Sequence, residues 1–300
     1  MDYKVGDYVT RNSYNNDLVF KIVKIDNNIA YLKGVNVRLS ADSLLDDLRS
    51  AGRIDINDDE FIDNTFNDLN LDRSQYFYLP GSILHIDGDE EYLSRCMKLY
   101  DKMHIKANGV YISEKEMSAK VTNLLNEFHP DILILTGHDA YYSRTNKEYQ
   151  NSINYINAVK EARKYEKNQD KLIIIAGACQ SDYEDLIKAG ANFASSPKRI
   201  NIHALDPAVV AVALAFSEKS KSIDLINLIN KTKYGSDGIG GIITNGTMYV
   251  GYPREWLKIL KLKLKKMLVL NTNLYLMVLE INLKNLKVLL IILIIKFLLY

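Results

Sequence analysis

From residue 82 onward, short apolar stretches alternate with amphipathic ones, and this alternation restricts the folds open to the chain. A repeating order of strand and helix is typical of a parallel sheet with helices on its faces. We expect strands at residues 82–86, 109–112, 132–136, 172–176 and 192–195. Helices are expected near residues 89–102, 114–128, 149–166, 181–189, 206–217 and 221–231. A turn should follow at residues 238–241, and then a last strand or hairpin at residues 242–250. The sequence thus predicts an α/β domain over residues 77–256, with a mainly parallel sheet and flanking helices.

The first 46 residues follow a different pattern, of short strands broken by Asn- and Asp-rich turns. The expected strands are residues 7–10, 19–25 and 30–33. This spacing predicts a small β-barrel of the SH3-like type at residues 1–46. Residues 47–76 should form an acidic linker, because residues 55–72 hold seven acidic residues, four Asn and no Lys or Arg. We expect this linker to be mobile or weakly helical.

The tail at residues 257–300 has an abruptly different composition, with no Gly, Pro, Ala, Ser, Asp or Arg. Its longest uncharged stretch, Met267–Leu279, has 13 residues, whereas a membrane-spanning helix needs about 20. The sequence therefore predicts no integral membrane span. An amphipathic surface helix and a shifted reading frame in an AT-rich gene both explain the composition of the tail.

Charge and cysteine content exclude several classes of protein. The tail carries eight Lys and one Glu, a charge of +7, which leaves −6 on the rest of a chain whose total is +1. An acidic folded part argues against nucleic-acid binding. Two cysteines form no disulfide framework, metal-binding spacings are absent, and we expect no metal and no cofactor. No signal peptide is visible at the N-terminus, so we expect reduced thiols in a cytosol-like compartment.

Two neighbouring strands of the predicted sheet end in a reactive side chain. Strand 132–136 runs into Gly137 and His138, and strand 172–176 runs into Gly177, Ala178 and Cys179. The two residues are 41 positions apart, which fits one strand, one crossover helix and the next strand. Since ligands bind at the carboxyl ends of parallel strands, His138 and Cys179 are expected to share a site.

The residue types suit nucleophilic catalysis. A thiol just before a helix that begins near residue 181 meets the positive end of the helix dipole, which favours the thiolate. The backbone N–H of Cys179 is a candidate oxyanion donor, and His138 is a candidate acid–base partner. The alternative is that Cys179 is an ordinary buried cysteine and His138 a loop histidine. Cys96 has the spacing of a helix core face, and His203 could line the cleft.

Longer motifs surround these strand ends and continue beyond them, at residues 84–90, 135–141, 176–181, 190–197 and 201–207. These motifs resemble the YabG sporulation peptidases of endospore-forming bacteria. The similarity extends from about residue 3 to 254 and stops before the tail. It implies a cysteine endopeptidase, made in the mother-cell cytoplasm and later associated with the spore. Its expected partners are protein substrates, namely spore-coat proteins and precursors of germination proteins, with cleavage after arginine.

The two strand ends also resemble, more distantly, the caspase, clostripain and gingipain group. In that group the histidine is normally followed by Gly, whereas here Gly137 precedes it. This departure leaves the second oxyanion donor open, with the backbone of Gly137 as the candidate. By position, Asp87 is the preferred carboxylate for the arginine pocket, with Asp89 and Asp139 as alternatives. Gln180, directly after the cysteine, is a further candidate to line the cleft.

Two other functions remain open on the sequence. A noncatalytic spore-coat assembly module could use the small barrel and the acidic linker to bind partners. An acyl transferase or amidase could use the same Cys–His pair.

Overall fold

The computed structural model describes residues 3–52, 54, 56–66, 71, 76–142 and 148–252. The chain divides into two units, of which the first comprises Met1–Leu71 and Tyr78–Val250 and the second comprises Asp72–Phe77 and Gly251–Tyr300. Nearly all described residues belong to the first unit. The predicted tail at residues 257–300 lies outside the described residues.

The N-terminal part of the first unit is an antiparallel sheet with strand order β4-β3-β2-β1-β5. Its strands are β1 (Tyr8–Arg11), β2 (Phe20–Asp26), β3 (Ile29–Gly34), β4 (Ser40–Leu44) and β5 (Leu48–Ser50), with short 3-10 turns at η1 (Asn12–Tyr14) and η2 (Leu45–Asp47). We call these strands the N-terminal sheet. Alternating apolar side chains, such as Phe20 and Ile22 of β2, form its core. The segment predicted as a mobile or weakly helical linker contains β5, which belongs to the N-terminal sheet, and the helix α1 (Asp59–Phe66).

The larger part is a mainly parallel sheet with strand order β14-β13-β12-β9-β7-β8. Its strands are β7 (Ile83–Asp87), β8 (Ala107–Tyr111), β9 (Ile132–Thr136), β12 (Ile173–Ala176), β13 (Phe193–Ser195) and β14 (Ile239–Gly241). Neighbouring strands run parallel, except that β14 is antiparallel to β13. The predicted α/β class with a mainly parallel sheet is confirmed.

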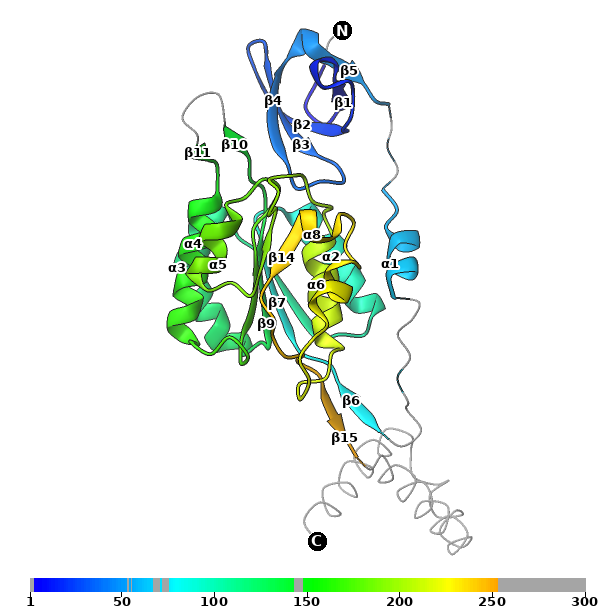
Figure 1. Cartoon of the computed structure of the whole chain (residues 1–300). Coiled ribbons are helices and arrows are strands. Elements are labelled where there is room, and N and C mark those ends of the chain that lie inside the picture. The colour runs from blue at the N-terminus through cyan, green and yellow to red at the C-terminus, as the bar shows by residue number, and fades with distance from the viewer. Residues whose placement is uncertain are drawn as a thin grey trace, which may run out of the picture. The chain divides into compact units, whose positions relative to one another are not determined.

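Helices cover both faces of this sheet, as Figure 1 shows. On one face lie α3 (Glu114–Phe128), α4 (Ser152–Tyr165) and α5 (Tyr183–Ala189), and on the other lie α2 (Glu90–Lys102) and α6 (Asp206–Ala215). Successive strand residues alternate between the two faces: Ile132 and Ile134 pack in the cluster with α2 and α6, whereas Leu133 and Leu135 pack with α3 and α4. Both faces are apolar because both are buried, as expected for a parallel sheet.

Short elements complete the fold. They are β6 (Phe77–Leu79), β10 (Tyr141–Tyr142), β11 (Glu148–Tyr149), α7 (Leu225–Ile229), α8 (Gly235–Gly238) and β15 (Tyr249–Gly251). The predicted turn at residues 238–241 is instead the end of α8 followed by β14. Added side chains at Gly240 and Gly241 would meet the rings of Tyr183 and Phe193, so these glycines allow an edge strand to pack closely. Among the described residues no helix has the length and apolar character that a membrane span requires.

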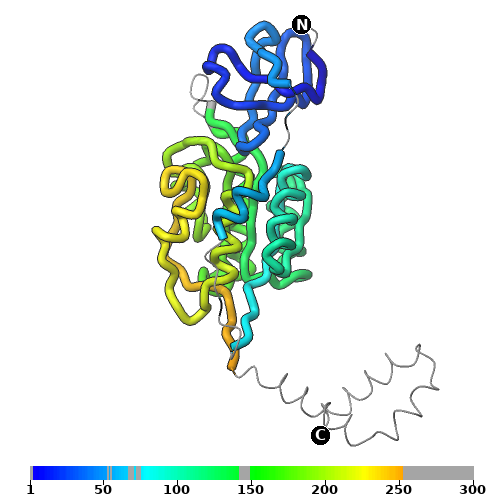
Figure 2. Tube along the Cα trace, turned by 90° about the vertical axis from the view of Figure 1, so that its right-hand side faces the viewer, coloured from blue at the N-terminus to red at the C-terminus, as the bar shows by residue number. Residues whose placement is uncertain are grey.

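The N-terminal sheet contacts the carboxyl edge of the parallel sheet. Leu39, just before β4, makes a parallel bridge with Asp139, which follows β9. Val37 makes an antiparallel bridge with His203, which precedes α6. In Figure 2 the blue N-terminal strands accordingly lie beside the green segment that follows β9.

Candidate active site

Three adjacent strands deliver the central side chains of the candidate site. One residue from each strand lies in register across β7, β9 and β12, and these residues are Ile86, Leu135 and Ala176. Asp89, His138 and Cys179 each come three residues later in their own segment. Because parallel strands end at a common edge, equal offsets bring the three residues to one level.

The imidazole of His138 pairs with the carboxylate of Asp89. His138 Nε2 lies 2.8 Å from Asp89 Oδ2, and Lys33 Nζ of the N-terminal sheet lies 2.7 Å from the same oxygen. Asp89 Oδ1 accepts the backbone N–H of Tyr92 at 3.0 Å and so caps α2. Burial alone raises the pKa of Asp89, but His138 and then Lys33 hold it below its usual value. Asp89 is therefore ionised and orients the imidazole.

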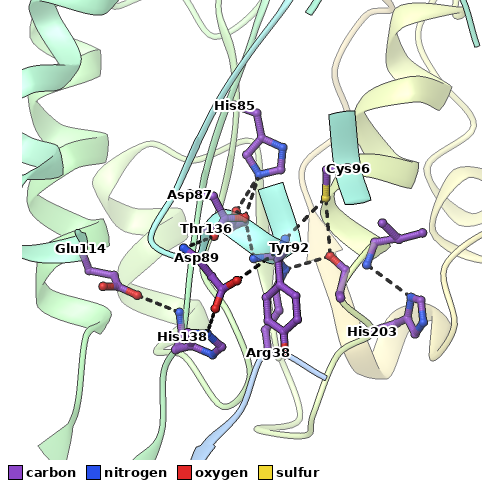
Figure 3. A network of polar contacts seen from close by, with 12 residues as sticks. Arg38, His85, Asp87, Asp89, Tyr92, Cys96, Glu114, Thr136, His138 and His203 are labelled. Atoms are coloured by element: carbon purple, nitrogen blue, oxygen red, sulfur yellow. Dashed lines mark hydrogen bonds and ion pairs between the residues drawn. The ribbon is translucent and has the colours of Figure 1, made fainter. Parts of the chain in front are cut away.

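The main chain of His138 is held from both sides, and Figure 3 shows its contact with Glu114. Its N–H donates to Glu114 Oε1 at 2.9 Å, and its carbonyl accepts from Asn151 Nδ2 at 2.8 Å and from Tyr155 Oη at 3.1 Å. The ring of Tyr92 lies 5.2 Å from the imidazole, centroid to centroid. Nδ1 of His138 is buried, and no described residue bonds to it. With Nε2 engaged by Asp89, Nδ1 is the nitrogen available for proton transfer.

Cys179 lies in a turn that glycine makes possible. Gly177 has φ +104°, and a side chain there would also collide with Leu186. Cys179 is completely buried, its thiol lies 3.6 Å from Ile202 O, and Ile202 N–H donates to Sγ at 3.2 Å. Burial raises the pKa of Cys179 to about 12, although Ile202 and Arg38 act in the opposite direction.

The expected dipole-stabilised thiolate is therefore absent in this arrangement, and the structure gives two reasons. The nearby helix α5 begins at Tyr183, and its N-terminus is already capped by Asp182, whose side chain accepts from Asp185 N. In addition, the thiol is buried away from water. The free-energy cost of desolvating a thiolate exceeds the stabilisation that the partial charge of a helix N-terminus provides. Cys179 is a neutral thiol while it stays covered.

Asp139 lies beside His138 but points into the protein. Its carboxylate accepts from Ala140 N at 2.9 Å, Asn151 N at 2.7 Å, Ser152 Oγ at 2.5 Å and Ser181 Oγ at 2.8 Å. Burial raises its pKa, and these hydrogen bonds act against that shift. Asp139 thus joins the turn after β9 to the turn after β12.

Asp87 holds a buried arginine. Asp87 Oδ2 lies 2.8 Å from Arg38 Nη1, and both side chains are fully buried. The same oxygen accepts from Thr136 Oγ1 at 2.9 Å, and His85 Nε2 lies 3.3 Å away. Burial opposes both charges, yet Arg38 keeps the pKa of Asp87 well below its usual range, and Asp87 raises the pKa of Arg38. Of the three predicted pocket carboxylates, Asp87 is the one that binds a guanidinium in the structure (Figure 3).

The remaining wall of this arginine pocket comes from α2 and from the segment before α6. Arg38 Nε donates to Ala204 O at 2.9 Å, and Arg38 Nη2 lies 3.6 Å from Cys96 Sγ. Cys96 is on the buried face of α2, as its spacing predicts, and burial raises its pKa to about 12. It lines the pocket as a neutral thiol.

The remaining predicted residues, Gln180, His203 and Gly137, lie at the rim of the candidate site. Gln180 has φ +57°, accepts from Tyr141 N at 3.2 Å and donates to Asn201 Oδ1 at 3.3 Å. The His203 ring packs 4.9 Å from Phe61 of α1, and burial lowers its pKa to about 4. His203 therefore contributes its backbone, not a charge, to the edge beside Val37. At Gly137 a side chain would collide with Glu114, so glycine allows that close approach.

Sequence reasoning missed several residues of the site: Lys33, Arg38, Tyr92 and Glu114. Glu114 and Tyr92 sit near helix starts in ordinary helical patterns, and Arg38 lies in a loop far away along the chain. An arginine between apolar residues, in Val35–Leu39, was the available signal, because arginine is rarely buried without a partner.

Among the described residues no group of His, Cys, Asp and Glu is arranged to hold a metal ion. The chemistry available at this edge is that of a thiol, an imidazole with one free nitrogen, and a carboxylate pocket for a guanidinium.

Two comparisons with known proteins place the chain. The family model described as YabG peptidase U57 matches residues 4–70 and 56–253. The chain is 37% identical over 290 residues to the sporulation-specific protease YabG of Bacillus subtilis (strain 168), an alignment that covers 84% of this chain and 99% of that protein. The chain therefore belongs to the YabG peptidase family, a family of sporulation proteases.

Proposed function

We propose that the chain is a cysteine endopeptidase that cleaves after arginine, with Cys179 as nucleophile and His138 as acid–base partner. The observation that carries the proposal is that Asp89, His138 and Cys179 each follow an in-register strand residue by three positions, at one edge of the sheet. In addition, His138 Nδ1 is buried and has no hydrogen-bond partner among the described residues. Neutral imidazole can take the thiol proton at that nitrogen. Asp89, bonded to Nε2, stabilises the imidazolium that forms.

The reaction follows from these groups. The Cys179 thiolate attacks the arginyl carbonyl carbon, and the backbone N–H of Cys179 stabilises the oxyanion, with Gly137 N–H as the proposed second donor. The C–N bond then breaks as imidazolium Nδ1–H gives its proton to the leaving amine. Water hydrolyses the thioester after His138 has taken one of its protons. Asp87 selects arginine, because a buried carboxylate binds a guanidinium better than an ammonium.

The finer assignments belong to the same proposal. A mainly parallel sheet with His and Cys after adjacent strands supports a caspase-like peptidase domain, and the small antiparallel sheet supports an SH3-like barrel before it. We propose spore-coat and germination-protein precursors as substrates, and the mother cell as the place of synthesis. The name of the Bacillus subtilis relative supports a role in sporulation.

One observation favours the noncatalytic alternative, a spore-coat assembly module. Cys179 is fully buried and its pKa is raised to about 12, as for a structural cysteine. The two functions make opposite predictions for variants that keep the fold.

The test compares wild type with Cys179→Ala, His138→Ala and the control His129→Asn. His129 precedes β9, whereas His138 follows it, so the control changes a histidine at the opposite edge of the sheet. A candidate spore-coat protein is incubated with each variant, and mass spectrometry identifies the cut positions. We expect cuts after arginine with wild type and His129→Asn only, inhibition by iodoacetamide, and no effect of chelators. Full activity of Cys179→Ala, or loss with EDTA that added metal restores, would refute the mechanism.

A further inference from the structure

The segment from Asn36 to Leu39, between β3 and β4, lies against the candidate active site through isolated β-bridges at Val37 and Leu39. Arg38 N–H donates to Ile202 O at 3.4 Å, and Ala204 N–H donates to Asn36 O at 3.1 Å. Between these bonds, Val37 makes an antiparallel bridge with His203. This is the main-chain pattern of strand addition, by which extended peptides bind to a free edge.

Arg38 contacts the candidate active site through its backbone carbonyl and through its guanidinium. Its carbonyl oxygen accepts the N–H of Cys179, the proposed oxyanion donor, at 3.4 Å. Its guanidinium lies 2.8 Å from Asp87, the proposed specificity carboxylate, and donates to Ala204 O. A substrate arginine whose carbonyl is attacked by Cys179 must make both contacts. The two contacts are independent, since one comes from the backbone and the other from the end of a long side chain.

Residues 36–39 also cover the thiol of Cys179. Val37, Leu39, Cys179 and Ile202 belong to one apolar cluster, and Cys179 has no exposed surface. Two side chains of α2 bond to the backbone of this segment and of the adjacent Val35. Tyr92 Oη donates to Val37 O at 2.8 Å, and Arg95 Nη1 donates to Val35 O at 2.8 Å.

We infer that residues 36–39 are a built-in substrate mimic, which fills the peptide groove with Arg38 in the arginine pocket and keeps Cys179 covered until it is displaced. The groove consists of the backbone edge Ile202–Ala204 and the Asp87 pocket. That this groove belongs to a peptidase rests on the proposed function. That it is a site for an arginyl peptide, occupied by the chain itself, rests on the contacts alone.

The first experiment does not depend on catalysis. Agmatine, which carries the arginine side chain without its carboxylate, is added to the full-length chain during thermal unfolding. We expect agmatine to raise the Tm of Arg38→Ala but not of wild type, because the pocket of wild type is filled. Arg49→Ala removes an exposed arginine from β5 of the same sheet and serves as the matched control. In the double variant Arg38→Ala/Asp87→Asn the agmatine effect should disappear.

The second experiment measures access to Cys179. Iodoacetamide labelling is followed by mass spectrometry, which separates the Cys179 peptide from the Cys96 peptide. We expect Cys179 of Arg38→Ala to react about tenfold faster or more, because reactivity scales with the fraction of uncovered molecules. Arg38→Lys retains a cation for Asp87 and is used if Arg38→Ala does not fold; it should react at an intermediate rate.

The outcomes separate the inference from the function on which it rests. Agmatine stabilisation of Arg38→Ala together with faster labelling of Cys179 supports the mimic, even if no variant cuts a protein. The inference is overturned if a folded Arg38→Ala or Arg38→Lys labels at the wild-type rate and agmatine has no effect on it. If labelling and agmatine behave as expected but no variant hydrolyses an arginyl peptide, the proposed function fails and the occupied groove remains.

Discussion

Replacing Asp139 by alanine tests whether one carboxylate holds the His138 turn and the Cys179 turn together. The carboxylate accepts two backbone N–H groups, from Ala140 and Asn151, and two hydroxyls, from Ser152 and Ser181. The serine hydroxyls extend the connection, because Ser181 Oγ accepts from Ala178 N and Ser152 Oγ accepts from Asp182 N. Alanine leaves all four donors without this partner.

The loss of stability can be estimated from the two backbone donors. Each buried N–H left unpaired costs about 1–3 kcal/mol. Burial raises the pKa of this carboxylate, so its removal also removes the cost of burying it. That gain offsets part of the loss from the unpaired N–H groups. We therefore expect Asp139→Ala to lower the free energy of unfolding by about 2–4 kcal/mol. The assay is urea unfolding followed by circular dichroism, in which a slope of about 1–3 kcal/mol per molar makes the midpoint shift by about 0.7–4 M.

The same change should lower kcat/KM more than stability alone explains, because His138 is the neighbour of Asp139 and Cys179 is two residues from Ser181. Asp139→Asn should be milder, since an amide still accepts one of the backbone N–H groups. Asp42→Ala, at an exposed position of β4, is the control. An Asp139→Ala chain with the wild-type urea midpoint and the wild-type rate of arginyl peptide cleavage would refute this reasoning.

Three further changes follow from the site and the chain ends. In the Arg38→Ala background, where no internal arginine competes for the pocket or is left buried without its partner, Asp87→Asn should lower kcat/KM for arginyl peptides at least about tenfold, a loss of roughly 1.4 kcal/mol or more of charge-assisted binding; equal kinetics of Arg38→Ala and Arg38→Ala/Asp87→Asn would place the pocket elsewhere. Because His138 and Lys33 hold the pKa of Asp89 below its unfolded value, their contribution to stability is present above about pH 4 and is lost as the pH falls further. Asp89→Asn should therefore be less stable at pH 7 and lose less stability on acidification, and parallel urea curves at pH 7 and pH 3 measure this; equal acid losses in both proteins would contradict it. Ending the chain after Trp256 should preserve fold and activity and improve solubility, because the family match ends at residue 253; a truncated chain that fails to fold would show that the tail packs on the rest.

The strands and helices of the α/β part were predictable because their patterns are long and local. Strand 132–136 and helix 114–128 have the predicted bounds, since an apolar run and a 3.6-residue period define each one directly. The strand β14 was not predictable from its residues. Its sequence Ile-Gly-Gly is typical of a turn, and it becomes a strand only because β13 offers an edge that glycines can approach closely.

For the site, the sequence could place side chains at strand ends but not determine their partners. The positions of His138, Cys179 and Asp87 follow from which strands are parallel neighbours. The pairing of Asp89 with His138 depends on how far each loop extends beyond its strand, which has no sequence signature. The contact of Arg38 with Asp87 joins residues 49 positions apart and packs one sheet on another, so no local pattern encodes it. Burial of Cys179, which raises its pKa, depends on packing with Val37 and Leu39, which also lie far away along the chain.

The energy that holds residues 36–39 in the groove determines how a separate protein could replace them. A substrate arginine would offer Asp87 the same guanidinium as Arg38 does, so exchange replaces one buried ion pair by an equivalent one and leaves no charge unpaired. The main-chain bonds to Ile202 and Ala204 are likewise available to any extended peptide. What favours the internal segment is its attachment to the chain, which presents it at an effective concentration of roughly millimolar. A substrate must compete with that concentration, and the competition raises the apparent KM while it leaves kcat unchanged, because the bound substrate meets the same Cys179 and His138. Closely packed substrates, at high local concentration, are therefore cut in preference to dilute ones.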